Sequence, residues 1–188
     1  MKTFISAALT ADGYIAKETN HAAFWTSKED KKRFVELTKR AGVVVMGLTT
    51  FRTLGKPLKG RTNIVYSPEA FEGETKTYGT GEIAGADVST TETKGETETI
   101  VERTTDSPAD LLKKLENRGF KEVAICGGAS IYNMFMKSGL VETLYLTIEP
   151  IMFGKGIRLF NDDMEHKLTL KNCVQTEGGS LLLEYDVN

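Results

Sequence analysis

Short apolar runs alternate with helical patterns along most of this chain. The apolar runs indicate strands at 3–9, 41–47, 61–67, 122–128 and 141–151, and the helical patterns lie at 27–40, 49–55, 107–120 and 129–139. Strands that are apolar over their whole length are typical of a sheet covered on both faces. The alternation therefore predicts an α/β fold whose central, mostly parallel, twisted sheet carries helices on both faces. The tail, 166–187, turns at Gly178-Gly179 and predicts a C-terminal antiparallel hairpin at one edge.

The length of the chain bounds the number of domains. At 188 residues it can bury one sizeable core and is short for two, so residues 1–188 are predicted to form a single domain. The stretch 73–100 is rich in Thr, Glu and Gly and has few large apolar residues. It is therefore predicted to be a surface insertion rather than a second domain.

Charge and composition exclude several classes of partner. The net charge is −2 and no basic block is present, so nucleic acid and anionic membrane are poor candidates. The first apolar run ends at Asp12, too short for a secretory signal, and nothing approaches the ~20 apolar residues of a membrane span. The expected location is the cytoplasm. His21 and His166 have no Cys or His neighbour at ligand spacing, so no metal site is expected.

Two strand ends carry glycines directly before a helix. In "AICGGASIY" the pair Gly127-Gly128 follows an apolar run, and Gly47 follows another run and precedes Thr49 and Thr50. Each glycine is compatible with a simple tight turn. Each is also compatible with a phosphate that bare backbone N–H groups approach at a helix N-terminus. Because ligands of open α/β sheets bind at the carboxyl ends of the strands, the two loops together favour a dinucleotide.

Asp30 is the candidate acid. It lies in the first turn of the predicted helix 27–40, where the helix dipole favours any carboxylate, and Glu29 competes for the same reason. Asp30 and Phe34 are four residues apart and share one face of that helix. An acid beside an apolar side chain that faces a pocket can have a raised pKa and donate a proton.

Two further polar residues have both a structural and a functional interpretation. Arg61 opens the strand at 61–67 and is either a solvated surface arginine or a clamp for a carboxylate or phosphate. Ser67 ends the same strand and either caps a turn or touches a phosphate. Cys126 ends an apolar strand and is expected to be a packed thiol, not half of a disulfide.

Several of these motifs together resemble the dihydrofolate reductase family. The stretch "VVVMGLTTFRTLGKPLKGRTNIVYS", 43–67, is similar to the core block of that family without a gap. "AICGGASIYNMF" followed by "LYLT" resembles its second cofactor loop and the next strand, and "ISAALTADGYIA" resembles its first strand and flexible loop. "WTSKEDKKRF" has the family's spacing for a water-holding tryptophan, the catalytic acid and a substrate-packing phenylalanine.

The resemblance implies roles for individual residues. It makes Asp30 the catalytic acid, with Trp25 beside it and the Thr147 hydroxyl bonded to it. It implies that substrate contacts come from Ser6, Ala8, Asp30, Phe34, Leu54, Arg61 and Cys126, with Arg61 holding a carboxylate of the substrate. It implies that NADPH contacts come from Ala8, Ile15, Gly47, Leu48, Thr49, Thr50, Ser67, Cys126, Gly127, Gly128, Ala129, Ser130, Ile131 and Tyr132.

The resemblance also implies the reaction. The expected function is NADPH-dependent reduction of 7,8-dihydrofolate, a small-molecule substrate, by a monomer or a homodimer. Two departures bear on this expectation: Leu48 stands where the family usually has a basic residue, and "PIMFGKGIRLF" resembles the reductase domain of bacterial riboflavin biosynthesis instead. The alternatives are therefore the riboflavin-pathway 5-amino-6-(5-phosphoribosylamino)uracil reductase and a non-catalytic nucleotide-binding module on the same fold.

Overall fold

A computed structural model describes residues 1–71, 77–78 and 98–188 of the chain. The strands are β1 (Lys2–Thr10), β2 (Tyr14–Ala16), β3 (Val43–Gly47), β4 (Thr62–Tyr66), β5 (Thr77–Tyr78), β6 (Thr99–Thr104), β7 (Glu122–Ile125), β8 (Thr143–Glu149), β9 (Ile157–Arg158), β10 (Leu168–Gln175) and β11 (Leu181–Val187). The helices are a short 3-10 helix η1 (Ala23–Trp25), α1 (Lys28–Ala41), α2 (Leu48–Leu54), α3 (Pro108–Asn117) and α4 (Ala129–Lys137).

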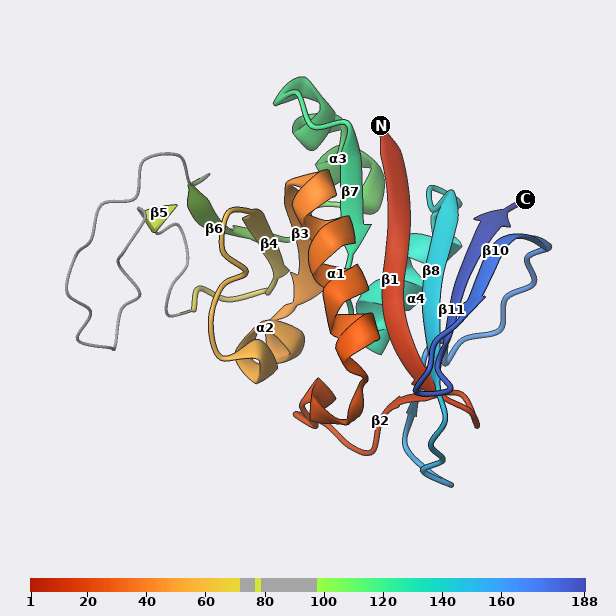
Figure 1. Cartoon of the computed structure of the whole chain (residues 1–188). Helices are drawn as coiled ribbons and strands as arrows, with labels where there is room; N and C mark the ends of the chain where they lie inside the picture. Colours follow the sequence, from red (N-terminus) through yellow and green to blue (C-terminus); the bar gives the residue numbers. More distant parts are fainter. Residues whose placement is uncertain (72–76, 79–97) are drawn as a thin grey trace.

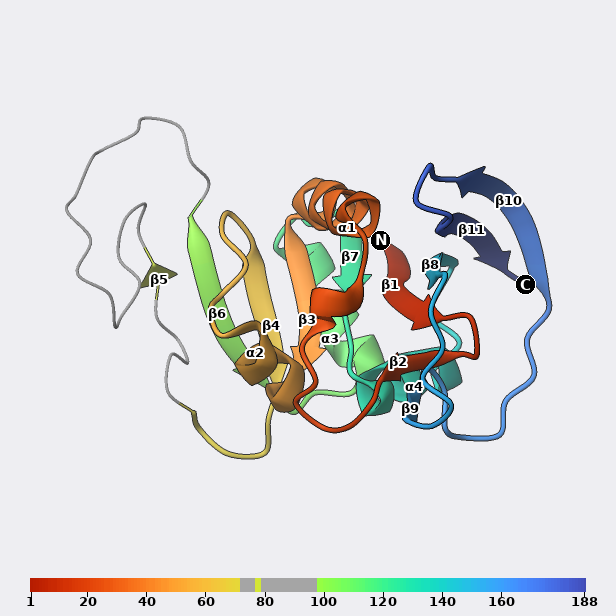
Figure 2. The ribbon, with the colours of Figure 1, turned by 60° about the horizontal axis from the view of Figure 1, so that its bottom comes forward.

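Within the described residues, nine strands form one sheet in the order β10-β11-β8-β1-β7-β3-β4-β6-β5. The strands β8, β1, β7, β3, β4 and β6 are parallel to their neighbours in this series. The hairpin β10–β11 pairs antiparallel with β8 and continues the sheet past it (Figure 2). The predicted α/β fold with a mostly parallel sheet and a C-terminal hairpin is confirmed.

The central strands bury both of their faces, which explains their continuous apolar sequence. In β3, Val43 and Val45 belong to one core cluster, whereas Val44 and Met46 belong to the other. The first cluster is shared with α3 and α4, and the second with α1 and α2. The helices accordingly lie in two layers, α1 and α2 on one face of the sheet and α3 and α4 on the other (Figure 1).

The helix boundaries follow the local signals in the sequence. The Ser27 hydroxyl caps α1 by accepting from the backbone N–H of Asp30, and Gly42 ends the helix in the left-handed conformation. The Ser107 hydroxyl caps α3 in the same way, with Pro108 in its first turn. These boundaries matter for the site, because the Ser27 cap fixes where the first turn of α1 presents its carboxylates.

The predicted insertion at 73–100 falls mostly on 72–76 and 79–97, which lie outside the described residues. Its last residues were misassigned, because Thr99 already begins β6, and β6 pairs in parallel with β4 as a further strand of the main sheet. In the sequence "TIVERT", Thr99, Val101 and Thr104 are buried, whereas Arg103 is exposed. The predicted insertion therefore overlaps the first two residues of β6, and the polar residues of β6 explain why the strand was not predicted.

Candidate active site

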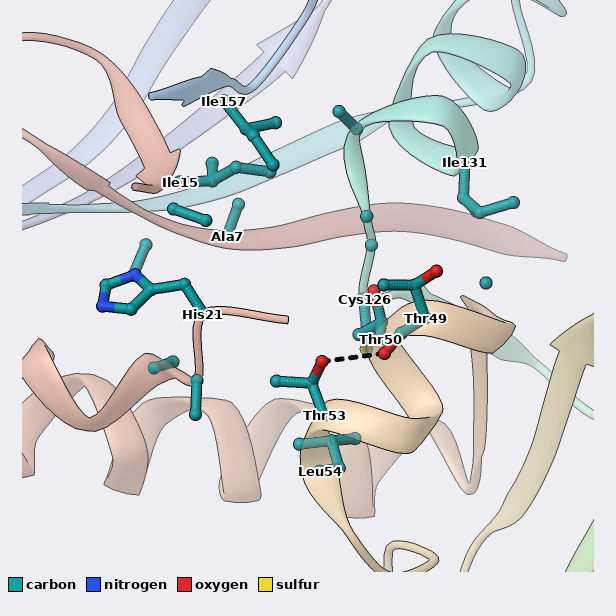
Figure 3. A pocket seen from close by; sticks show the side chains of 18 of the residues that line it. Ala7, Ile15, His21, Thr49, Thr50, Thr53, Leu54, Cys126, Ile131 and Ile157 are labelled. Carbon is teal, nitrogen blue, oxygen red and sulfur yellow. Dashed lines mark hydrogen bonds between the residues drawn. The ribbon is translucent and has the colours of Figure 1, made fainter. Parts of the chain in front are cut away.

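A pocket of about 800 Å³ opens at the carboxyl ends of β1, β3 and β7. Its walls come from α1, α2, the N-terminus of α4 and the segment 15–26 (Figure 3). The lining includes the following residues predicted from the sequence: Ser6, Ala8, Ile15, Trp25, Asp30, Phe34, Gly47, Leu48, Thr49, Thr50, Leu54, Cys126, Gly127, Gly128, Ala129, Ser130, Ile131 and Tyr132. Thr147, Arg61 and Ser67 are not part of it.

The two glycine loops meet at the floor of this pocket. The backbone N–H of Gly47 donates to the carbonyl of Gly127 at 2.8 Å, which joins the end of β3 to the loop after β7. Thr49 and Thr50 of α2 stand beside this junction, with Cys126 and Ile131 close by (Figure 3). The prediction that the two helix N-termini lie near each other therefore matches the structure.

The glycines keep the backbone bare where the loops approach one another. A Cβ atom at Gly128 would come within 3.3 Å of the Thr50 hydroxyl, and one at Gly47 within 3.3 Å of Ile131. Gly127 has φ +109°, where a side chain would be strained whatever the space. The result is a cradle of backbone groups at the start of α4, the kind of surface that binds a pyrophosphate.

Asp30 also lines the pocket, half-buried in the first turn of α1. Burial raises the pKa of its carboxyl group, and this effect exceeds the opposing effect of hydrogen bonds with the Thr147 and Thr26 hydroxyls. Thr147 is 2% exposed and reaches the carboxylate from β8, behind the pocket. Glu29 is exposed and does not line the pocket, so the geometry selects Asp30 from the two adjacent acids.

Trp25 and Phe153 pack together at the edge of the pocket. Their ring centroids are 5.1 Å apart in an edge-to-face arrangement, and the ring of His21 contacts Phe153 from a second side. The Asp12 carboxylate accepts from the backbone N–H groups of Phe153 and Gly154, which ties the segment 12–25 to the loop after β8. The indole N–H of Trp25 is buried and has no hydrogen-bond partner among the described residues. An incoming hydrogen-bond acceptor could pair with it.

Arg61 does not occupy the position expected of a carboxylate clamp. It lies at the amino end of β4, whereas the pocket is at the carboxyl ends of the strands, and it is only 5% exposed. Its guanidinium donates to the Thr38 hydroxyl at 2.7 Å and to the Lys59 carbonyl at 2.9 Å. The structure therefore corrects the expected substrate contact and makes Arg61 a buried support of α1.

Ser67 is corrected in the same way. It is 2% exposed, and its hydroxyl donates to the Glu69 carbonyl at 2.6 Å, which caps the turn after β4. Tyr66, the residue before it, lines the pocket instead. Thr26, Lys31 and Tyr66 are pocket residues that the sequence did not reveal, because their positions depend on how the loops fold over the sheet.

Cys126 is a buried free thiol, as expected, and burial raises its pKa to about 12. Such a thiol is not ionised at neutral pH and is a poor nucleophile. Among residues 1–71, 77–78 and 98–188, no group of three or more His, Cys, Asp or Glu side chains could hold a metal ion. No helix of this described part is long and apolar enough to cross a membrane.

Replacing Arg61 by Ala is expected to act on stability and not on binding. Hydrogen bonds to a charged group contribute about 1.5–3 kcal/mol, so chemical denaturation should show a loss of unfolding free energy of that order. The NADPH Kd, measured where the variant is folded, should remain within about 2-fold of wild type, which is less than 0.5 kcal/mol. The exposed Arg52→Ala is the matched control and should change neither quantity. A large rise in Kd or KM without loss of stability would show that Arg61 contributes to binding after all.

The strand order and the C-terminal hairpin agree with the dihydrofolate reductase-like fold that the sequence resemblance implies. Within this fold, residues 2–182 match the RibD C-terminal domain family, and the chain belongs to that family. The expected cofactor is confirmed at the level of the family, whose reductases use NADPH.

The chain is also similar to individual proteins of known sequence or structure. The protein YwjB of Bacillus subtilis is 26% identical over 195 residues, which cover 98% of this chain and 97% of YwjB. A pyrimidine reductase-like protein of Corynebacterium diphtheriae has a TM-score of 0.74 at 19% identity, over 100% of this chain and 92% of its own.

Two larger proteins share the fold over part of their length. RibD of Acinetobacter baumannii has a TM-score of 0.75 at 15% identity, and the match covers 100% of this chain but 58% of RibD. The diaminohydroxyphosphoribosylaminopyrimidine deaminase/5-amino-6-(5-phosphoribosylamino)uracil reductase of Thermotoga maritima has a TM-score of 0.73 at 16% identity, and 56% of it is covered. At these identities the structural matches show the fold alone.

The family assignment overturns the main functional expectation. Dihydrofolate as the substrate is wrong, because residues 2–182 match the RibD C-terminal domain family and not a dihydrofolate reductase family. The motifs that suggested dihydrofolate reductase belong to the part of the fold that both families share. The alternative drawn from "PIMFGKGIRLF", a reductase of the riboflavin type, is the better supported interpretation.

Proposed function

We propose that this protein is an NADPH-dependent reductase of a small pyrimidine substrate, of the kind that riboflavin biosynthesis uses. The observation that carries the proposal is one pocket that is lined both by the backbone cradle and by the half-buried acid Asp30. The family and the names of its structural neighbours supply the substrate class.

The residues of the glycine loops fit the cofactor. Gly47–Thr50 and Gly127–Tyr132 line one continuous part of the pocket, and their bare backbone and hydroxyl groups suit a pyrophosphate. NADPH, when bound, supplies a hydride. Ala7, Ala8 and Ile15 present small and apolar surface in the same pocket, which would suit a nicotinamide ring.

Asp30 completes the chemistry that a hydride acceptor needs. Reduction adds a hydride and a proton, and a half-buried carboxyl group with a raised pKa can deliver the proton. Phe34, Leu54 and Trp25 form apolar walls on that side of the pocket and suit a flat heterocycle. The Thr147 and Thr26 hydroxyls hold the carboxylate in one orientation.

Oxidation of NADPH, followed by its absorbance, tests this function directly. The purified protein should oxidise NADPH with 5-amino-6-(5-phosphoribosylamino)uracil and not above background with dihydrofolate. Asp30→Asn serves as the inactive control for either substrate. Binding of NADPH without turnover of the pyrimidine would contradict the proposal and favour a nucleotide-binding module.

A further inference from the structure

A buried carboxylate outside the pocket lies directly behind the first turn of α1. Glu149, the last residue of β8, is 3% exposed, and its oxygens accept three hydrogen bonds. Oε1 accepts from both the backbone N–H and the hydroxyl of Ser27, each at 2.8 Å. Oε2 accepts from the hydroxyl of Ser180 at 2.6 Å, at the start of β11. Glu149 therefore joins the cap of α1 to the C-terminal hairpin.

Ser27 links Glu149 to Asp30 through hydrogen bonds. A serine hydroxyl has a single hydrogen, and Ser27 donates it to Glu149. Its oxygen is then free to accept from the backbone N–H of Asp30, at 3.1 Å. The Ser27 hydroxyl thus acts as both donor and acceptor, and these two hydrogen bonds fix the first turn of α1 relative to β8.

Glu149 and Thr147 reach α1 from the same face of β8. Side chains two residues apart on a strand point to the same side, so both face the first turn of the helix. Thr147 hydrogen-bonds the Asp30 carboxylate, whereas Glu149 holds Ser27, the residue that caps the helix carrying Asp30. The negative charge of Glu149 also raises the pKa of Asp30, as a smaller cause than burial.

We propose that Glu149 is a positioning residue for Asp30, fixing the acid through Ser27 and placing a negative charge behind it. The proposal rests on the proposed function, in which Asp30 delivers a proton. The other charged or titratable groups near the acid are Arg33 on α1 and Tyr132 on α4, and Lys31, Glu18 and His21 also line the pocket. The ammonium of Lys31 is bound to the Thr26 carbonyl at 2.8 Å.

Glu149→Gln removes the negative charge of this side chain and keeps its shape. The amide oxygen can still accept from Ser27, and the amide nitrogen can donate to the Ser180 hydroxyl, so the fold should be retained. Without the charge, Asp30 loses a proton at lower pH, and the alkaline limb of the pH–kcat profile should move to lower pH. At neutral pH kcat should fall, because a smaller fraction of Asp30 is then protonated. KM and the NADPH Kd should stay within about 2-fold, because Glu149 does not line the pocket.

Two further variants make the result specific. Glu142→Gln is the matched control, because Glu142 precedes the same strand and accepts from the Thr3 backbone N–H at 3.3 Å, away from α1. It should leave the profile unchanged. Ser27→Ala keeps both carboxylates and the backbone hydrogen bond to Glu149, but it removes the hydroxyl that joins Glu149 to the Asp30 N–H, so kcat should fall without a move of the alkaline limb.

Titration of the Asp30 carboxyl carbon by NMR gives a measurement independent of turnover. In Glu149→Gln the titration midpoint should lie below that of the wild type. Identical midpoints and identical pH profiles in an active enzyme would overturn the positioning role. A wild type that oxidises no NADPH with any pyrimidine would instead overturn the proposed function, and the NMR comparison would still judge Glu149.

Discussion

Asp30→Asn is expected to lower kcat at neutral pH by about 10²–10⁴-fold, the loss typical of a missing general acid. Asparagine keeps the shape of the side chain and can still contact the Thr147 and Thr26 hydroxyls, but it has no proton to deliver. The measurement is kcat for NADPH oxidation across the pH range. Activity of the variant should rise as the pH falls toward the pKa of the substrate, because the solution then supplies the proton.

The pH dependence of the wild type follows from the direction of the Asp30 pKa. Burial raises this pKa above its value in the unfolded chain, so the protonated acid is available up to the folded pKa and activity should decline as the pH rises through it. The contribution of Asp30 to the free energy of unfolding depends on pH in the same direction as activity does. The contribution of Asp30 is fully present below the unfolded pKa and is lost as the pH rises through the folded one. At neutral pH Asp30→Asn should therefore melt no lower than the wild type.

These expectations distinguish lost chemistry from a damaged fold. Glu29→Gln changes the adjacent acid, which is exposed and outside the pocket, and should retain nearly full activity. The NADPH Kd of Asp30→Asn should stay close to that of the wild type. A larger defect in Glu29→Gln, or a lowered Tm together with lost NADPH binding in Asp30→Asn, would show that Asp30 is not the acid.

The regular elements could be predicted because each depends on local sequence. Continuous apolar runs predicted β3 and β7, and the Ser27 cap with Gly42 fits the observed limits of α1. The strands β2, β6 and β9 were missed. They are short or polar, and their pairing is fixed by partners elsewhere in the chain rather than by their own pattern.

The candidate site was only partly predictable for the same reason. Glycines at strand ends and an acid on the apolar face of a helix leave a sequence pattern, and both line the pocket. Arg61 has no such pattern, since its role depends on which end of β4 it occupies and on the Thr38 hydroxyl beneath it. Glu149 reads as an ordinary strand-end acid, and only the folded chain brings it against Ser27.

The substrate was the part least accessible to sequence motifs. Dihydrofolate reductases and the RibD C-terminal family share the fold, so residues that build the fold and hold NADPH do not separate them. The segment that differs, "PIMFGKGIRLF", includes Phe153 and β9 at the edge of the pocket. It contacts the loop that carries Trp25, which is where a difference in substrate would be expected to show.

Gly128→Val is expected to raise the Kd for NADPH at least ~10-fold, equivalent to about 1.4 kcal/mol. The backbone of Gly128 is extended, with φ −76°, so it lies outside the left-handed region that favours glycine. Its Cβ would come within 3.3 Å of the Thr50 hydroxyl and would fill the gap between the two glycine loops. A branched side chain there would hold a pyrophosphate away from the N–H groups at the start of α4. Titration of the protein with NADPH by calorimetry measures the loss.

The hairpin provides the matched control for this substitution. Gly178→Val introduces the same side chain in the turn between β10 and β11, where the nearest atom to a new Cβ would be the Thr176 hydroxyl at 3.8 Å. Any loss of unfolding free energy that valine causes simply by replacing glycine should appear in both variants. The loss of NADPH affinity should appear only in Gly128→Val. If a folded Gly128→Val binds NADPH as tightly as Gly178→Val does, the loop 127–132 is a structural turn and the cofactor phosphates lie elsewhere. Because Gly47 and Gly127 are joined by a hydrogen bond, that result would also remove the Gly47 loop from the cofactor site.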